Sequence, residues 1–331
     1  MSDQHILVLA TGGTIAGTAG SATRRDYRPG QIGIAEFLAE IATLDLPAKL
    51  EGRQIANIGS EDMGPDLWRK LHEAASEALA DPACGGIIVT HGTDTAEETA
   101  FLLDQTLPCH KPVVLVGAMR PADAVGSDGL RNFANGVRVA GDEAAAGRGV
   151  VLVMSDRVFA ARDARKALTS GVDAFRGFPR GPIGHVTPTS LDWFGPAWRL
   201  DENGHPEGAR YELFTDSPRV PILHAYAGMP TIDVDRALGD GAQGLVFAGF
   251  GEGNMPGPVR DRLAAAAESG VLVVRASRVD EGLVDREPDD ARLGFIAARA
   301  LGPAKARVLL QLLLANGVTD PQEAQAAFDR R

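Results

Sequence analysis

Two threonines that follow glycines, each beyond a short apolar run, are the first residues whose type and setting could do chemistry. Thr14 comes after the apolar run 6–9 and a glycine pair, and Thr93 comes after the run 87–89 and a glycine, with Asp94 next to it. In parallel sheets, the catalytic and binding residues usually lie just beyond the carboxyl ends of the strands. A threonine hydroxyl becomes a nucleophile once a neighbouring group takes its proton. The sequence therefore predicts a site around Thr14, with Thr93 and Asp94 as its first candidate partners.

The glycine-rich turn at Gly12 and Gly13 also invites a phosphate-binding interpretation, which its pattern does not support. A dinucleotide fingerprint needs a second glycine where Thr14 stands, and the lysine of a P-loop is missing. The chain has no G-x-S-x-G elbow and no H-E-x-x-H motif, and its 7 histidines are scattered. We therefore expect neither a serine-elbow mechanism nor a metal site.

The residues around Thr93 have structural alternatives. Asp94 and Thr95 could simply cap the helix that follows, and Thr95 with Glu98 has the spacing of a capping box. His91 could be catalytic, although a histidine at a strand end is more often packed and hydrogen-bonded. For Thr95 the capping role is favoured. Thr93 and Asp94 together, opposite the other Gly-Thr pair, favour a functional site.

Strand and helix patterns alternate along the chain, which indicates a parallel sheet with helices on both faces. In the first half the expected strands are 6–9, 53–58, 86–90, 113–116 and 150–154, and the expected helices are 34–41, 65–79, 96–107 and 129–146. The pattern fades between about 191 and 218 and then resumes. In the second half the expected strands are 220–225, 244–248 and 271–275, and the expected helices are 260–268, 303–315 and a last one capped by Asp320.

The fold class that follows is α/β, with two α/β domains of unequal size. Residues 1–190 are expected to form the larger N-terminal catalytic domain, a doubly wound and mainly parallel sheet with a catalytic loop. Residues 191–218 are expected to be a linker, because proline, glycine and aspartate are scattered there without a period. Residues 219–331 are expected to form a smaller C-terminal α/β domain.

Composition narrows the class of partner. The 331 residues carry a formal net charge of −11, so a broad nucleic-acid or anionic-membrane surface is not expected. No apolar run approaches the roughly 18 residues of a membrane span. The chain enters its first strand within a few residues, which favours a cytoplasmic protein, with a periplasmic one as the alternative if a leader was removed. Cys84 and Cys109 could meet on neighbouring strands, but buried free thiols are the favoured interpretation.

Taken together, several segments resemble the bacterial L-asparaginase/glutaminase family, of the larger homotetrameric type. The resemblance covers nearly the whole chain, and its two specific signatures are ATGGTIAG at 10–17 and IIVTHGTDT at 87–95. Supporting matches are 57–63, 116–121 and 305–310. The resemblance implies a cofactor-free amidohydrolase that cleaves the side-chain amide of L-asparagine and, secondarily, of L-glutamine.

The resemblance also implies catalytic roles for five residues. Thr14 would attack the amide to give an acyl-enzyme, and Tyr27, on the loop 17–33, would help to activate it. Thr93, Asp94 and Lys166 would form a second unit that relays protons. Lys166 lies in the run RDARK at 162–166, which by itself would be read as solvated charge.

Further positions are implied to bind substrate. The backbone N–H groups of Gly13 and Thr93 would stabilise the oxyanion. Asp94 and Glu61 would accept the α-ammonium, and Ser60 would donate to the α-carboxylate. The remaining implied positions are Ala118 in the first domain and Asn254 and Glu287 in the second.

The resemblance implies an assembly as well. Asn254 and Glu287 would complete the site of a neighbouring subunit in a homotetramer that is a dimer of dimers. Glu61 stands where many relatives have glutamine, and in the family a glutamate here accompanies some glutaminase activity. The loop 17–33 is expected to close over the site. The alternative of another class is a non-catalytic amino-acid-binding or sensor protein on the same scaffold.

Overall fold

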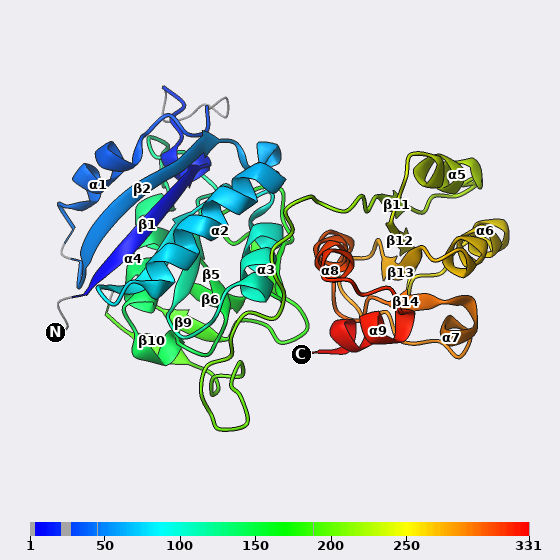
Figure 1. Cartoon of the computed structure of the whole chain (residues 1–331). Helices are drawn as coiled ribbons and strands as arrows, with labels where there is room; N and C mark the ends of the chain where they lie inside the picture. Colours follow the sequence, from blue (N-terminus) through cyan, green and yellow to red (C-terminus); the bar gives the residue numbers. More distant parts are fainter. Residues whose placement is uncertain (1–3, 21–27, 45, 188, 331) are drawn as a thin grey trace. The chain divides into compact units, whose positions relative to one another are not determined.

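The structure, a computed structural model, describes residues 4–20, 28–44, 46–187 and 189–330. The chain divides into two compact units, residues 1–210 and 211–331 (Figure 1). Residues 191–210, expected in the linker, therefore belong to the first unit, where β10 (Leu191–Trp193) joins the sheet.

The first unit is built on an eight-stranded sheet with the order β10-β9-β6-β5-β4-β3-β1-β2. Its other strands are β1 (His5–Gly12), β2 (Lys49–Ile58), β3 (Cys84–Thr90), β4 (Val113–Val116), β5 (Val150–Met154), β6 (Arg157–Ala160) and β9 (Gly184–Val186). Five neighbouring strands, in the order β5-β4-β3-β1-β2, pair in parallel. The other three strands, β6, β9 and β10, pair antiparallel at one edge. The expected mainly parallel sheet is confirmed, and the antiparallel edge is an addition of strands too short to show a period.

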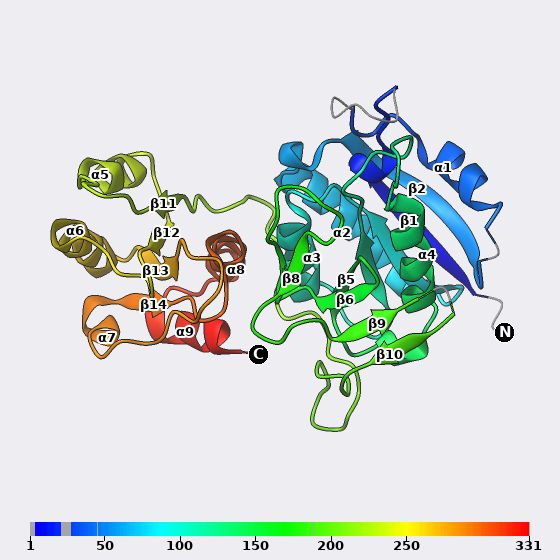
Figure 2. The same cartoon turned by 180° about the vertical axis from the view of Figure 1, so that it is seen from behind.

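Alternate residues of β1 face two separate cores, which is why its sequence is apolar without alternation. Ile6 and Val8 pack with helices α1 (Ile34–Ile41) and α4 (Gly129–Ala140). Leu7 and Leu9 pack on the other face with helix α2 (Pro65–Ala80) and helix α3 (Ala96–Thr106). Figures 1 and 2 show these helix pairs on opposite faces of the sheet. The first unit is therefore doubly wound, as expected.

The second unit is a four-stranded parallel sheet with the order β11-β12-β13-β14. Its strands are β11 (Ile222–His224), β12 (Gly244–Gly249), β13 (Leu272–Ser277) and β14 (Phe295–Ala297). Its helices are α5 (Ile232–Gly239), α6 (Gly257–Glu268), α7 (Asp290–Leu293), α8 (Pro303–Ala315) and α9 (Pro321–Asp329). The Asp320 side chain accepts a hydrogen bond from the Glu323 N–H at 2.9 Å, which confirms the expected cap of the last helix.

Several local expectations need correction or addition. The expected helix 129–146 ends at Ala140 and is followed by a 3-10 turn, η3 (Glu143–Ala145). The Thr95 side chain makes no capping hydrogen bond within the described residues, although α3 does start just after it. A separate two-stranded sheet, β7 (Ala164–Lys166) with β8 (Phe175–Gly177), was not expected. Both cysteines are buried free thiols, as favoured.

The length and hydropathy of the helices indicate whether any of them could cross a membrane. Within residues 4–20, 28–44, 46–187 and 189–330, none of the helices combines the length and hydropathy that a membrane crossing requires.

A buried ion-pair cluster ties residues 199–208 to the first unit's core. The Arg199 side chain is only 1% exposed, and it pairs with Asp104 at 3.3 Å and with Glu207 at 3.2 Å. Asp104 also accepts the Val150 N–H at 2.9 Å, so its carboxylate is shared between the ion pair and the start of β5.

Replacing Arg199 by methionine is expected to destabilise the first unit by about 3–5 kcal/mol, because it leaves a buried carboxylate without its cation. Tryptophan fluorescence during urea unfolding measures this, since Trp68, Trp193 and Trp198 all lie in the first unit. Arg53→Met is the control, because Arg53 and its partner Glu77 are 47% and 67% exposed. Loss of such a surface pair costs about 1 kcal/mol or less. Equal effects of the two variants would contradict the prediction.

Candidate active site

The two glycine–threonine turns meet at the carboxyl edge of the first sheet. β1 and β3 are adjacent and parallel, with Ala10 opposite Thr90, so both strands end at the same edge. Thr14 begins the 3-10 turn η1 (Thr14–Ala16) after β1, and Thr93 follows β3. Both are buried and line one cavity of about 220 Å³. The cavity is lined by Gly13, Thr14, Pro29, Gly59, Ser60, Glu61, Gly92, Thr93, Asp94, Met119, Lys166 and Thr169.

Glycine at position 13 is what lets the two turns touch. Gly13 has a φ of 80°, in the region that favours glycine. A Cβ atom there would lie 2.4 Å from the Gly92 backbone nitrogen and 2.5 Å from its Cα. Any side chain at Gly13 would therefore push the two threonine-bearing turns apart.

The N–H of Gly13 is already committed, which corrects its expected role as an oxyanion donor. It donates to the Ile58 carbonyl oxygen at 2.8 Å, at the end of β2. A donor satisfied inside the protein is not available to a substrate oxygen. The Thr93 N–H is the donor that remains from the expected pair. Gly13 contributes instead by having no side chain, which lets the two turns come into contact.

Lys166 joins Thr93 and Asp94, although it lies more than seventy residues away in sequence. Its Nζ donates to Thr93 Oγ1 at 2.8 Å and forms a short ion pair with the Asp94 carboxylate. The Lys166 side chain is 18% exposed, whereas that of Asp94 is 61% exposed. The Lys166 ammonium group is therefore shielded from solvent on the side of Thr93, whereas its partner Asp94 is in contact with solvent. Such an arrangement can move a proton between the lysine and the threonine hydroxyl.

Ser60 sits on the third wall of the cavity, in the 3-10 turn η2 (Ser60–Asp62) after β2. Its Oγ accepts the Asp94 N–H at 3.1 Å, and its carbonyl accepts the Thr95 hydroxyl at 2.8 Å. Thr95 thus holds Ser60 rather than capping α3. The sequence offered no signal for this except the adjacency of Thr95 to Asp94. Glu61, next to Ser60, is exposed and lines the same cavity.

Ala118 is buried in the turn after β4, and its neighbour Met119 lines the cavity. This turn is held by Asp128, whose carboxylate accepts the N–H groups of Met119 and Arg120, both at 3.0 Å. Asn132 donates to the carbonyl of Gly117 at 3.0 Å. Asp128 and Asn132 are supporting residues that the sequence analysis did not identify.

The loop 17–33 is only partly within the described residues. Tyr27, expected to activate Thr14, lies outside them, as do residues 21–26. At the base of the loop, the Thr18 and Arg28 backbones pair with each other. The Asp123 carboxylate accepts the N–H groups of Ala19 and Gly20, each at 2.9 Å. The base of the loop is thereby joined to the turn after β4.

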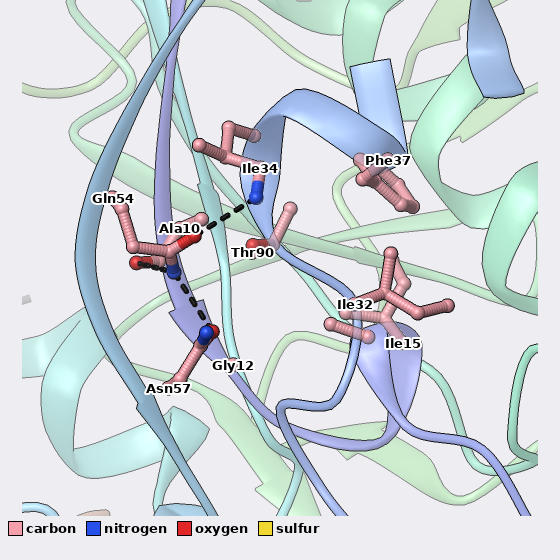
Figure 3. A pocket seen from close by; sticks show the side chains of 10 residues that line it. Ala10, Gly12, Ile15, Ile32, Ile34, Phe37, Gln54, Asn57 and Thr90 are labelled. Carbon is pink, nitrogen blue, oxygen red and sulfur yellow. Dashed lines mark hydrogen bonds between the residues drawn. The ribbon is translucent and has the colours of Figure 1, made fainter. Parts of the chain in front are cut away.

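A much smaller cavity lies on the other side of β1 and is shown in Figure 3. Its volume of about 10 Å³ is enough for one water molecule at most. Gln54 organises its wall: Oε1 accepts the Ile34 N–H at 2.8 Å, and Nε2 donates to Asn57 Oδ1 at 2.9 Å. This cavity is too small for a substrate.

His91 is a packed histidine. Its Nδ1 lies 2.7 Å from the Gly92 carbonyl oxygen, and Nε2 has no hydrogen-bond partner among the described residues. Burial lowers the pKa of His91 from the usual 6.5 to about 4, and the hydrogen bond to Gly92 only partly opposes this. The ring is therefore neutral at physiological pH. It does not line the 220 Å³ cavity, so the favoured structural interpretation fits its position.

This buried ring predicts a pH dependence of stability. Between pH 6.5 and 4 the unfolded chain binds a proton on His91 that the folded chain does not, so the free energy of unfolding should fall as the pH is lowered. The contribution is on the order of 3 kcal/mol across this window. Urea unfolding at pH 7 and pH 4.5, followed by tryptophan fluorescence, should show a smaller fall in His91→Asn than in the wild type. His205→Asn, with a side chain 76% exposed, is the control and should fall as the wild type does.

The two expected residues of the second unit lie in loops at the carboxyl edge of its sheet. Asn254 follows β12, and its N–H donates to the Phe250 carbonyl at 2.7 Å. Glu287 follows β13 and pairs with Arg275 at 3.1 Å. Arg275 is nearly fully buried and also donates to the Glu252 carbonyl at 2.6 Å. One guanidinium therefore links the loops that carry Asn254 and Glu287, and the sequence analysis did not identify it.

The described residues offer no metal-binding arrangement. Across the ranges that the structure describes, no three side chains of His, Cys, Asp or Glu come together in a way that could hold an ion. The chemistry of the 220 Å³ cavity is that of hydroxyl, ammonium and carboxylate groups with backbone donors.

Comparison with known proteins places both units in one family. The model described as "Asparaginase, N-terminal" matches residues 5–199, and the model described as "Glutaminase/Asparaginase C-terminal domain" matches residues 219–328. The chain is 40% identical to "L-asparaginase 2" of Escherichia coli K12 over 330 residues, which cover 98% of this chain and 93% of that protein. It is 33% identical to "Glutaminase-asparaginase" of Pseudomonas fluorescens, covering 98% of this chain and 90% of that protein.

A solved structure shares the fold. The crystal structure of a probable cytoplasmic L-asparaginase from Campylobacter jejuni matches with a TM-score of 0.92 at 34% identity, covering 98% of this chain and 99% of that chain. A relative from Haemophilus influenzae, 41% identical over 98% of this chain and 92% of its own length, is named as a probable periplasmic L-asparaginase.

Proposed function

Because the chain belongs to the asparaginase family, we propose that it is an L-asparaginase, an amidohydrolase that converts L-asparagine into L-aspartate and ammonia. One observation carries this proposal in the structure: Lys166 contacts both Thr93 and Asp94 on the wall of the cavity that Thr14 also lines. A nucleophile candidate and a proton relay thus share one small polar space. Glutamine is a secondary substrate, and no cofactor takes part.

The first half of the reaction forms an acyl-enzyme. Thr14 Oγ bonds to the amide carbon of the substrate, and its proton is removed with the help of Tyr27, as the family resemblance implies. The oxyanion that develops is stabilised by the Thr93 N–H. The carbon–nitrogen bond then breaks, and the nitrogen takes up the proton that left Thr14 and departs as ammonia.

The second half is hydrolysis of the ester on Thr14. A water molecule adds to the acyl carbon, the ester bond breaks, and aspartate leaves while Thr14 regains its proton. Lys166 is bound to Thr93 and Asp94 and relays protons through the threonine hydroxyl in these steps.

Charge complementarity supports the choice of an amino acid as substrate. Asp94 and Glu61 are exposed carboxylates on the cavity wall and accept the α-ammonium group. The hydroxyl of Ser60 already accepts a bond from Asp94 N–H, so its own hydrogen is directed to the α-carboxylate. Glu61 in place of the family's more frequent glutamine supports the secondary glutaminase activity.

The assembly and the compartment are part of the proposal. The protein forms a homotetramer, a dimer of dimers, in which Asn254 and Glu287 complete the cavity of a neighbouring subunit. A single subunit would then be nearly inactive. The cytoplasm is the proposed compartment, with the periplasm as the alternative.

The test is the balance of products. Incubation of the protein with L-asparagine should release ammonia and L-aspartate in equal amounts, and with L-glutamine ammonia should appear more slowly. Succinamate, which lacks the α-ammonium group, should be a poor substrate because Asp94 and Glu61 lose their partner. Binding of L-asparagine without release of ammonia would overturn the proposal and favour the amino-acid-binding alternative.

A further inference from the structure

The backbone of Lys166 has a partner that the mechanism above does not use. Its N–H donates to a carboxylate oxygen of Glu97 at 2.9 Å. Glu97 lies in the first turn of α3, three residues after Asp94. We propose that Glu97 is a positioning residue, which holds the Lys166 backbone so that its ammonium reaches Thr93 and Asp94 in the reactive arrangement. This inference rests on the proposed function.

The pairing of β7 explains why Lys166 needs this partner. Among the described residues, β7 pairs with β8 alone, in a two-stranded sheet with Lys166 opposite Phe175. The next residue, Ala167, donates its N–H to the Ala174 carbonyl at 2.8 Å. Hydrogen-bonded and non-hydrogen-bonded positions alternate in an antiparallel pair, so the N–H of Lys166 points away from β8. Glu97 accepts this outward N–H.

Residues 93–97 therefore hold Lys166 at two points, its side-chain ammonium group and its backbone N–H. Thr93 and Asp94 bind its ammonium, and Glu97 binds its backbone. A hydrogen bond to a carboxylate is stronger than one to a neutral acceptor, and a carboxylate in the first turn of a helix is further stabilised by the helix dipole. Fixing the backbone fixes the point from which the long lysine side chain extends toward Thr93 and Asp94. Misplacement of a reacting group by about 1 Å can cost about 100-fold in rate.

The strand keeps a second support when the carboxylate is lost, so variants of Glu97 are expected to fold. Ala164 and Phe175 pack on Ala96 and Phe159 in a buried apolar cluster. β7 would then remain near α3 with a looser end at Lys166.

The experiment compares three substitutions of Glu97 in the full-length protein, with L-asparagine as substrate. Glu97→Ala should lower kcat about tenfold or more while KM changes by about twofold or less, because the substrate contacts remain. Glu97→Asp keeps the charge but is one methylene too short to reach, so it should lose activity as the alanine variant does. Glu97→Gln keeps an oxygen at the same reach and should recover most of the rate.

Glu73→Ala is the control, since it removes the same charge from an exposed position of helix α2 outside the cavity. It should leave kcat within about twofold of the wild type. Amide hydrogen exchange at Lys166 gives a second readout without activity, and it should become faster in Glu97→Ala and Glu97→Asp but not in Glu97→Gln.

The outcomes separate this inference from the proposed function. Absence of ammonia release by the wild-type protein would overturn the proposed function, whatever the exchange data show. A wild type that is active, with Glu97→Ala equally active or with slow exchange at Lys166 retained, would overturn the positioning role alone. Full recovery by aspartate together with loss in glutamine would also overturn it, because charge and not the hydrogen bond would then be what matters.

Discussion

Thr14→Ala is expected to release ammonia from L-asparagine about 10⁴-fold or more slowly than the wild type. The acyl-enzyme needs an oxygen on this side chain, and removal of a nucleophile that works as part of a unit costs nearly the whole effect of that unit. The variant should still fold, because Thr14 sits in a short turn whose backbone bonds do not use its hydroxyl: Gly17 N–H to the Thr14 carbonyl, at 2.9 Å, persists. Steady-state ammonia release measures the rate.

Binding and a matched control show whether the loss belongs to the chemical step. L-Asparagine should still bind Thr14→Ala in a calorimetric titration, since Asp94, Ser60 and Glu61 are unchanged. Thr169→Ala removes an exposed hydroxyl from the wall of the same cavity and should leave the rate within about twofold. If Thr14→Ala were active and Thr93→Val were not, the nucleophile would be Thr93 and the proposed order of roles would be reversed.

Lys166→Met is expected to lower kcat by about 10²- to 10⁴-fold, which is the usual contribution of a positioned acid–base group. Methionine fills much of the same volume but carries no proton, so the hydroxyl of Thr93 loses its partner at 2.8 Å. Asp94 loses its cation as well. Rates of ammonia release with saturating L-asparagine are the measurement.

Lys166→Arg separates proton transfer from charge. Arginine keeps the positive charge beside Asp94 but does not give up its proton in the working pH range, so it should not restore the rate. Lys49→Met is the control, because this lysine is 72% exposed and lies outside the cavity, and its kcat should stay near that of the wild type. An arginine variant as active as the wild type would contradict the relay and leave Lys166 a purely electrostatic role.

Elements with a continuous apolar run or a regular apolar stripe could be predicted from the sequence, and very short strands of mixed residues could not. β1, β3 and β4 are apolar runs covered on both faces, and α2 has a regular apolar stripe, so each carries its own signal. β7 to β10 have three residues each, too few for a period. β9 and β10 form because the edge of β6 is there to receive them, and β7 and β8 pair with each other over the buried cluster of Ala96 and Phe159.

The same contrast holds in the candidate site. Thr14, Thr93 and Asp94 were visible as hydroxyls and a carboxylate after predicted strands. Lys166 and Ser60 were reached only through the family resemblance, since neither has a local pattern that distinguishes it from a surface residue. The hydrogen bond that occupies the Gly13 N–H could not be foreseen, because its acceptor is the carbonyl of Ile58 on a different strand.

By itself, the sequence determined the α/β class, the glycine-threonine turns at the strand ends and the family. These depend on local periodicity and on residues adjacent in the chain. Only the tertiary structure decided that Thr95 holds Ser60, that Glu97 holds the Lys166 backbone and that His91 is buried with a lowered pKa. Each of these is set by groups that are distant in sequence or by exclusion of water, and neither is encoded in the spacing of neighbouring residues.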